Sequence, residues 1–197
     1  MDRLKKPYEP QNTEDRIYKL WEESGFFNPD NLPDPDTETF SIVLPPPNAT
    51  GVLHLGHTLE DAMQDTLIRY ARMRGKKTLW LPGTDHAAIA TDSKITKILE
   101  KEGIKKKDIG REKFLERVNT FVAESRKTIV SQLRKMGASL DWSREAFTLD
   151  EKRNLAVRTT FKKMYDDGLI YRGHRIVNWD PKGQTVISDD EIVYEER

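Results

Sequence analysis

The sequence predicts an α/β fold in which parallel strands alternate with helices. An apolar strand at Phe40 to Leu44 is followed by a helical spacing of apolar residues at Leu55 to Met73 and a second strand at Thr78 to Leu81. This order is typical of a βαβ unit with a parallel sheet. The segments that leave the two strands, Pro45 to Asn48 and Gly83 to His86, are therefore expected at one edge of the sheet, where open α/β sheets bind ligands.

Residues 1–36 are predicted to form a helix and a loop ahead of this domain. Asn12 or Thr13 can cap a helix that ends at Gly25. Three prolines among Asn and Asp residues indicate a loop from Asn28 to Asp36. The domain itself is then expected at residues 37–168.

Further helices and short strands are predicted after the second strand. The expected helices are Ala87 to Glu100, Arg111 to Met136 and Asp150 to Asp167. The expected strands are Leu169 to Tyr171, Arg175 to Trp179 and Glu191 to Tyr194. Turns are expected at Asp141 to Glu145 and at Asp180 to Gly183, because both segments are rich in turn-forming residues.

Two histidines lie at the start of the first helix of the domain. His54 and His57 are three residues apart, so they lie side by side on the helix. The positive end of a helix favours phosphate, and imidazoles can donate hydrogen bonds to a phosphate whose charge grows during reaction. Gly51 and Gly56 let the backbone approach a ligand closely. The pattern predicts a nucleotide site, whereas two ordinary surface histidines would leave the glycines and the preceding prolines unexplained.

Composition excludes several classes of function. Lys plus Arg and Asp plus Glu both number 33, so no overall basic field supports nucleic-acid binding along the whole chain. The 197 residues include no cysteine, which excludes disulfides and thiolate zinc sites and fits a reducing compartment. No apolar run is long enough to cross a bilayer and the first residues lack the apolar core of a signal peptide, so we expect a cytoplasmic protein without a membrane partner.

The string His54-Leu55-Gly56-His57 resembles the HIGH signature of the class I aminoacyl-tRNA synthetases. The strings Pro45 to Asn48 and Leu81 to Ala87 resemble the valyl members, because the isoleucyl and leucyl members have Gly-Trp-Asp in place of Gly83-Thr84-Asp85. The resemblance covers nearly the entire chain. It implies the first half of a Rossmann-like catalytic domain at residues 37–168, followed at residues 169–197 by the start of the connective editing insertion.

The resemblance also implies a role for individual residues. His54 and His57 would be catalytic, contacting the phosphates of ATP while the valine carboxylate attacks the α-phosphorus, and Asp85 would pair with the α-ammonium of valine. The implied ATP-binding residues are Asn48, Thr50, Gly51, His54, Gly56 and His57. The implied amino-acid-binding residues are Pro46, Pro47, Asn48, Asp85 and His86. Mg²⁺ is expected with ATP, and no protein ligand to a metal is assigned.

Several of these residues have a structural alternative. Asp85 or Thr84 could instead cap the helix that follows, because short polar residues are preferred there. Asn48 could be a turn residue, and His86 could serve only to satisfy backbone groups. Trp80 is expected in the core.

The expected function is ATP-dependent activation of valine and its transfer to tRNA(Val), with tRNA bound through domains outside this chain. The sequence has no Lys-Met-Ser-Lys-Ser string, the second signature of the family. Two alternatives therefore stay open: an ATP- and valine-binding half that needs a complementary C-terminal half as a second chain, and a small HIGH-type nucleotidyltransferase. Some family members bind zinc through cysteines where this chain has Asp180 and Gly183, so no zinc is expected.

Overall fold

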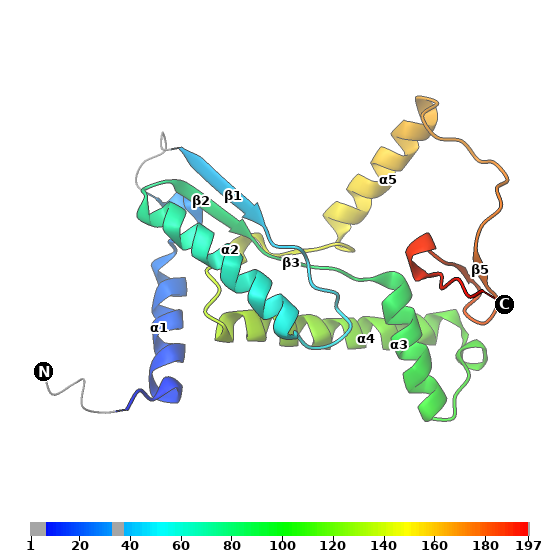
Figure 1. The fold of residues 1–197 in the computed structure, drawn as a ribbon, viewed down its shortest axis with the longest axis horizontal. Helices are drawn as coiled ribbons and strands as arrows, with labels where there is room; N and C mark the ends of the chain where they lie inside the picture. Colours follow the sequence, from blue (N-terminus) through cyan, green and yellow to red (C-terminus); the bar gives the residue numbers. More distant parts are fainter. Residues whose placement is uncertain (1–6, 33–37, 197) are drawn as a thin grey trace, which may run out of the picture. The chain divides into compact units, whose positions relative to one another are not determined.

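The computed structural model describes residues 7–32 and 38–196. The chain divides into two compact units, Met1–Asp150 and Glu151–Arg197. The first unit contains parallel strands that alternate with helices, which confirms the predicted α/β class (Figure 1).

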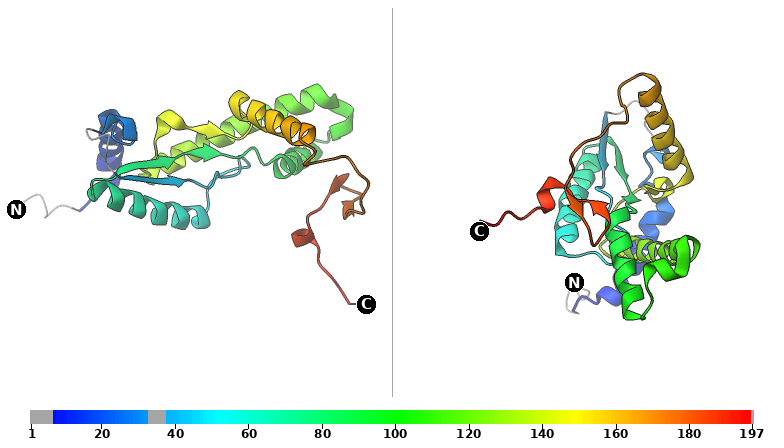
Figure 2. Two further views of the ribbon diagram at one scale, coloured as in Figure 1. Left: turned by 90° about the horizontal axis from the view of Figure 1, so that it is seen from above. Right: turned by 90° about the vertical axis from the view of Figure 1, so that its right-hand side faces the viewer.

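The predicted βαβ unit is present in the first unit. Strand β1 (Thr39–Val43) pairs in parallel with β2 (Lys77–Leu81), so that Ile42 lies opposite Trp80. Helix α2 (Leu55–Met73) connects them and runs alongside the strands in both Figure 1 and Figure 2. Its bounds are those predicted, because the apolar spacing and the two ends are local signals.

Two further strands of two residues each pair with one another in a separate sheet, and the sequence did not predict them. Strand β3 (Gly83–Thr84) pairs in parallel with β4 (Ala146–Phe147). The backbone N–H of Asp141 also donates to the carbonyl of Trp80, at 3.0 Å. The chain after α4 therefore returns beside β2 and arrives next to the strand ends.

Helix α1 (Pro10–Ser24) begins earlier than predicted. Glu9 is the N-cap and Pro10 occupies the first turn, so the predicted caps Asn12 and Thr13 are wrong. Gly25 ends the helix as predicted, with φ of 73°, a left-handed conformation that suits glycine. A short 3-10 helix, η2 (Pro29–Asn31), follows, and residues 33–36 of the predicted loop lie outside the described residues.

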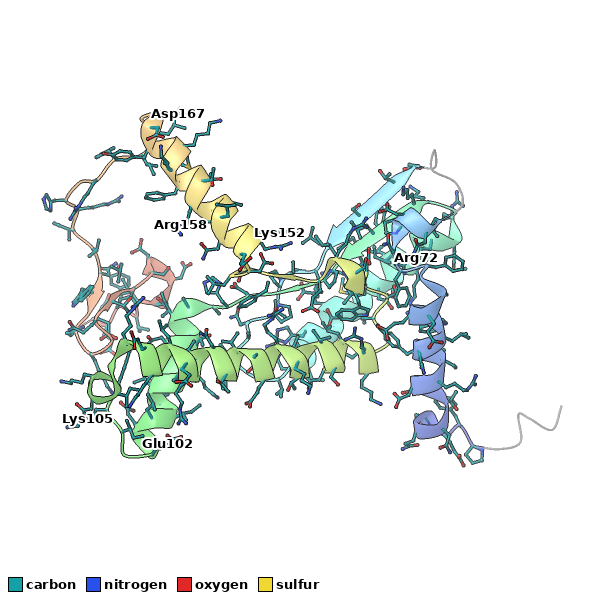
Figure 3. The ribbon with its side chains drawn as sticks, turned by 180° about the vertical axis from the view of Figure 1, so that it is seen from behind. Arg72, Glu102, Lys105, Lys152, Arg158 and Asp167 are labelled. Carbon is teal, nitrogen blue, oxygen red and sulfur yellow. The ribbon has the colours of Figure 1, made fainter. Side chains whose placement is uncertain are left out.

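Helices α3 (Ala88–Lys101) and α4 (Lys106–Lys135) follow β3. Gly110 interrupts the second of them with φ of 75° and ψ of 165°, so the regular helix begins at the predicted Arg111. Glu102 and Lys105 lie at the turn between the two helices (Figure 3). No helix among residues 7–32 and 38–196 is long and apolar enough to cross a membrane.

The larger of two buried clusters in the first unit lies between α2, α4 and one face of the sheet, and the smaller lies between α3 and α4. The buried members of the larger cluster are Leu44, Ile68, Trp80, Ile129, Leu133, Ala138 and Leu140. Trp80 is fully buried, as predicted, and its indole N–H donates to Gln64 of α2 at 2.9 Å. Phe40 and Ile42 of β1 point to this core, whereas Thr39, Ser41 and Val43 on the opposite face of the strand are exposed.

Polar side chains of α2 bind the segment that follows α4. Asp65 accepts hydrogen bonds from the backbone N–H and the hydroxyl of Ser139. Arg69 donates to the carbonyl of Gly137 at 2.7 Å, and Arg72 donates to the carbonyl of Ser139 at 2.8 Å. Arg72 lies at the C-terminal end of α2 (Figure 3). We call Asp65, Arg69 and Arg72 the α2 clamp.

Helix α2 keeps most of its apolar residues on the surface. The exposed members are Leu55, Leu59, Met63, Leu67, Tyr70 and Met73, all more than half exposed. We call them the outer stripe of α2. The buried residues of the helix are instead Asp61, Ile68 and Ala71. The apolar residues whose spacing predicted α2 therefore form an exposed face of the helix. The face that packs on the sheet is a different one.

The second unit contains helix α5 (Glu151–Asp166) and a small hairpin. Two of the predicted strands, Leu169 to Tyr171 and Glu191 to Tyr194, are not strands, and Arg175 to Trp179 contributes only Trp179. The strands found are β5 (Trp179–Asp180) and β6 (Thr185–Val186), which pair antiparallel.

The predicted turn at Asp180 to Gly183 joins the two strands of this hairpin. The Asp180 carboxylate accepts the backbone N–H groups of Lys182 at 2.9 Å and Gly183 at 3.0 Å. Strand propensity alone did not locate these strands, because a strand is stabilised by the partner it pairs with.

Asp61 is a buried carboxyl group in α2, and the structure predicts that it destabilises the fold at neutral pH. It is 3% exposed, and its Oδ2 has no hydrogen-bond partner among the described residues. Burial, with the charges of Glu60 and Asp65, raises the pKa of Asp61 from 3.8 to about 6. A carboxyl whose pKa is raised by folding favours the folded state when protonated, so this contribution is lost as the pH rises toward about 6.

We expect Asp61→Asn to stabilise the chain by about 1–3 kcal/mol at pH 7.5, and by much less at about pH 4. The reason is that asparagine is neutral at both pH values, whereas Asp61 must ionise in a buried position at the higher one. Thermal or urea unfolding at both values measures the difference. A gain of equal size at the two pH values would contradict a cost that comes from ionisation.

Candidate functional site

The segments that leave β1 and β2 stay paired beyond the strands. The backbone N–H of Asp85 donates to the carbonyl of Pro47 at 2.9 Å, and the N–H of Ala49 donates to the carbonyl of Asp85 at 2.7 Å. Asn48 and Asp85 therefore lie opposite each other in a parallel bridge. The N-terminal end of α2 lies on the same side of the unit as these strand ends (Figure 1). The predicted convergence of the two strand ends is confirmed.

The two histidines cap the start of α2 with their own rings. His54 is the N-cap residue, and its Nδ1 accepts the backbone N–H of Gly56 at 3.1 Å. The Nδ1 of His57 accepts the backbone N–H of His54 at 3.2 Å. Because an accepting ring nitrogen carries no hydrogen, each neutral ring has its proton on Nε2. Burial, with the neighbouring His54, lowers the pKa of His57, so the neutral form is favoured there.

Gly56 lies against the ring of His54. A Cβ at this position would come within 2.9 Å of His54 Cε1 and 3.1 Å of its Nδ1, so a larger residue would displace the ring. The backbone ahead of the pair is also held, since the N–H of Leu53 donates to the side chain of Gln132 at 2.9 Å. The two rings lie with their centroids 3.9 Å apart.

Asp85 follows β3 and lies at the bend before α3. Its Oδ1 accepts the backbone N–H of Ala87 at 3.0 Å and the hydroxyl of Thr148 at 3.0 Å. The N-cap of α3 is Ala87, so the alternative that Asp85 or Thr84 is the capping residue is wrong. Ala87 has φ of 43° and ψ of 62°, a left-handed conformation that strains a non-glycine residue and often marks functional sites.

His86 is hydrogen-bonded to Thr148, a residue that no sequence motif indicated. Its backbone N–H donates to Oγ1 of Thr148 at 2.9 Å, and its Nδ1 lies 2.6 Å from the same oxygen. Because the Thr148 hydroxyl hydrogen goes to the Asp85 carboxylate, Nδ1 of His86 must carry a hydrogen and donate. The Nε2 of a neutral His86 is then an acceptor. Thr148 was missed because it lies 62 residues after His86, outside every local pattern.

Arg126 of α4 was missed for the same reason. Its Nε donates to the hydroxyl of the buried Thr84 at 3.0 Å, and its guanidinium lies 4.2 Å from the centroid of the Phe147 ring. A second nitrogen donates to Glu145 at 3.1 Å. Arg126 thereby joins α4 to β3 and β4, next to the bend that carries Asp85.

The remaining predicted site residues lie in the segment between β1 and α2. Pro46 and the side chain of Asn48 are exposed, whereas Pro47 is buried. Thr50 and Gly51 are half-buried, and the N–H of Thr50 donates to the carbonyl of Asn48 at 2.7 Å. Asn48 is therefore an exposed residue whose backbone takes part in a turn.

Two cavities occur elsewhere in the first unit. One of about 380 Å³ lies along α3, and one of about 160 Å³ lies beside the C-terminal end of α1. Neither is lined by the strand-end residues. Among the described residues, no group of three or more His, Cys, Asp or Glu side chains is placed to hold a metal ion.

Two sets of side chains with opposite hydrogen-bonding character thus lie at this end of the first unit, one at the start of α2 and one at the bend after β3. His54 and His57 present N–H donors at the positive end of a helix, which suits an anion such as a phosphate. Asp85 and His86 present a carboxylate and a ring acceptor, which suit a cation such as an ammonium group.

Comparison with known proteins identifies the sequence relatives of the chain. Residues 16–197 match the family described as tRNA synthetases class I (I, L, M and V). The chain is 55% identical over 195 residues to the valine–tRNA ligase of Clostridium acetobutylicum, covering 99% of this chain and 22% of the relative. The valine–tRNA ligase of Fusobacterium nucleatum is 51% identical over 197 residues, with 100% and 22% covered. The chain therefore spans about a fifth of the length of the curated relatives it matches.

A comparison of structures supports the fold. The crystal structure of a ternary complex of LeuRS, tRNA and LeuAMS from Agrobacterium radiobacter is similar, with a TM-score of 0.78 at 24% sequence identity. The match covers 95% of this chain and 21% of that one. The resemblance found in the sequence is confirmed, and the chain belongs to the class I tRNA synthetases of the I, L, M and V group, with valine–tRNA ligases among its relatives.

Proposed function

We propose that this chain supplies the ATP- and valine-binding half of a valine–tRNA ligase, which activates valine and transfers it to tRNA(Val). One observation carries the proposal. The N–H donors of His54 and His57 and the acceptors of Asp85 and His86 lie at the same end of the parallel strands. Activation of an amino acid by ATP needs a site for phosphates beside a site for an ammonium group.

In this proposal the valine carboxylate attacks the α-phosphorus of ATP while His54 and His57 donate through Nε2 to the phosphate oxygens. Their stabilisation grows with the negative charge of the transition state. Asp85 pairs with the α-ammonium and so fixes the direction of attack. Pro46 and Pro47 would form the wall of the small apolar pocket for the valine side chain.

Mg²⁺ bound with ATP would neutralise part of the phosphate charge, and its ligands would be mainly phosphate oxygens and water. Transfer to tRNA would use regions beyond this chain, which spans about a fifth of its relatives. A role in tRNA charging would place the protein in the cytoplasm, which the cysteine-free sequence fits.

The first test is valine-dependent exchange of pyrophosphate into ATP by the purified chain. We expect exchange that valine stimulates more than threonine or isoleucine does, and that falls by at least about a hundredfold in the His54→Ala, His57→Ala double variant. Circular dichroism of the variant controls for loss of the helix cap. Valine-stimulated exchange that is equally fast in the wild type and the double variant would refute the role of the histidine pair, whereas a folded chain without exchange would favour the second candidate function below.

Gly56→Ala tests the position of the His54 ring without a large change in the stability of α2. Alanine favours a helix over glycine by about 0.5–1 kcal/mol, which offsets the loss of the hydrogen bond to the His54 ring. The new Cβ would displace that ring. We therefore expect a nearly unchanged midpoint of thermal unfolding and exchange reduced by at least about tenfold. Unchanged exchange would show that the ring position of His54 is not needed.

A second candidate function is an ATP- and valine-binding half that acts only with a complementary C-terminal half. Two observations favour it. The outer stripe of α2 is exposed, and the face of β1 that carries Val43 is exposed as well, although parallel sheets are usually covered on both faces. Exposed apolar surface of this kind is typical of a region that another part of a protein covers.

The double substitution Leu59→Lys, Met63→Lys tests this second candidate. Both side chains are exposed and lie one turn apart on the outer stripe, so the change should leave the circular dichroism unchanged. It should abolish co-elution of the chain with the C-terminal portion of the Clostridium acetobutylicum relative. Glu116→Lys, Thr120→Lys on exposed positions of α4 is the matched control and should leave co-elution unchanged. Co-elution that survives the α2 change would exclude the outer stripe as the contact.

A further inference from the structure

The hydroxyl of Thr148 joins the two acceptor residues of the site, Asp85 and His86. Its Oγ1 donates to Asp85 Oδ1 at 3.0 Å, accepts the backbone N–H of His86 at 2.9 Å, and lies 2.6 Å from Nδ1 of the same histidine. A threonine hydroxyl has one hydrogen to donate and two lone pairs to accept with. These three contacts use all of them.

The arrangement of hydrogens follows from this count. An ionised carboxylate can only accept, so the Thr148 hydrogen points to Asp85 and the His86 ring donates from Nδ1. Among the described residues, the hydrogen bonds of the Asp85 carboxylate all go to Oδ1. Oδ2 of Asp85 and Nε2 of His86 are then the atoms left to accept from a ligand.

The position of Thr148 is set by contacts outside the bend it supports. Its backbone N–H donates to the carbonyl of Thr84 at 3.2 Å, which continues the pairing of β3 with β4. The neighbouring Phe147 packs under Arg126 and against the His86 ring. Thr148 is therefore held by the pairing of β3 with β4. Asp85 instead lies on a bend, and Ala87, two residues after it, has a strained backbone.

We propose that Thr148 is a positioning residue that orients Asp85 and His86 so that Oδ2 and Nε2 face the α-ammonium group of the amino acid substrate. This inference rests on the proposed function for the identity of the ligand. Thr148 should affect the binding of the amino acid and not the binding of ATP, because Thr148 contacts Asp85 and His86 and not the histidine pair of α2.

The test uses Thr148→Val, which removes the hydroxyl at nearly constant shape, and Thr148→Ser, which keeps it. Thr128→Val is the matched control, since the hydroxyl of Thr128 donates within its own helix, to the carbonyl of Glu124 at 3.0 Å. In the exchange assay, Thr148→Val should raise the KM for valine by about tenfold and leave the KM for ATP within about twofold. Thr148→Ser and Thr128→Val should behave like the wild type.

A second readout does not depend on activity. The ¹⁵N shifts of the His86 ring in the 197-residue chain at about pH 8, where imidazole is neutral, should show hydrogen on Nδ1 in the wild type and in Thr148→Ser. They should show loss of that preference in Thr148→Val. An unchanged KM for valine in Thr148→Val, or a His86 ring insensitive to it, would overturn the inference. If the wild type shows no valine-dependent exchange, the proposed function fails, and the ring shifts still decide whether Thr148 positions the pair.

Discussion

The α2 clamp is the constraint on which the rest of the first unit depends. A long helix such as α4 ends with carbonyl groups that have no partner within the helix. Arg69 and Arg72 donate to the carbonyls of Gly137 and Ser139 just beyond that end, and Asp65 accepts from the Ser139 backbone. These bonds turn the chain so that it runs back beside β2, which brings β4 to the strand ends. Burial lowers the pKa of Arg72 to about 10, so the guanidinium remains charged at neutral pH and needs these acceptors.

Local elements of the fold could be predicted from the sequence, and long-range pairings could not. The bounds of α2 and the ends of α1 and α4 follow from apolar spacing and from glycines that act over a few residues. The pairing of β3 with β4 joins two dipeptides more than sixty residues apart, and neither has a pattern of its own. The apolar residues of α2 signalled a helix correctly but did not show which face packs on the sheet.

The residues of the candidate site also fall into those that the sequence could predict and those that it could not. His54, His57, Asn48 and Asp85 stand in or beside motifs, and the strand ends bring Asn48 and Asp85 together because parallel strands end at one edge. Their roles toward ATP and valine stay predictions. Thr148 and Arg126 could not be found from the sequence, because each acts through a contact that exists only after the chain has folded back. The residues that carry the chemistry are thus recognisable locally, whereas those that orient them are not.

The use of histidine rings as helix caps ties the architecture of α2 to acidity. A proton added to Nδ1 of either ring would occupy the lone pair that accepts a backbone N–H. Acid would therefore increase the positive charge offered to an anion while it loosens the first turn that aims this charge. The same protonation would thus strengthen the attraction for an anion and weaken the geometry that directs it, and the lowered pKa of His57 favours the neutral ring that keeps the cap.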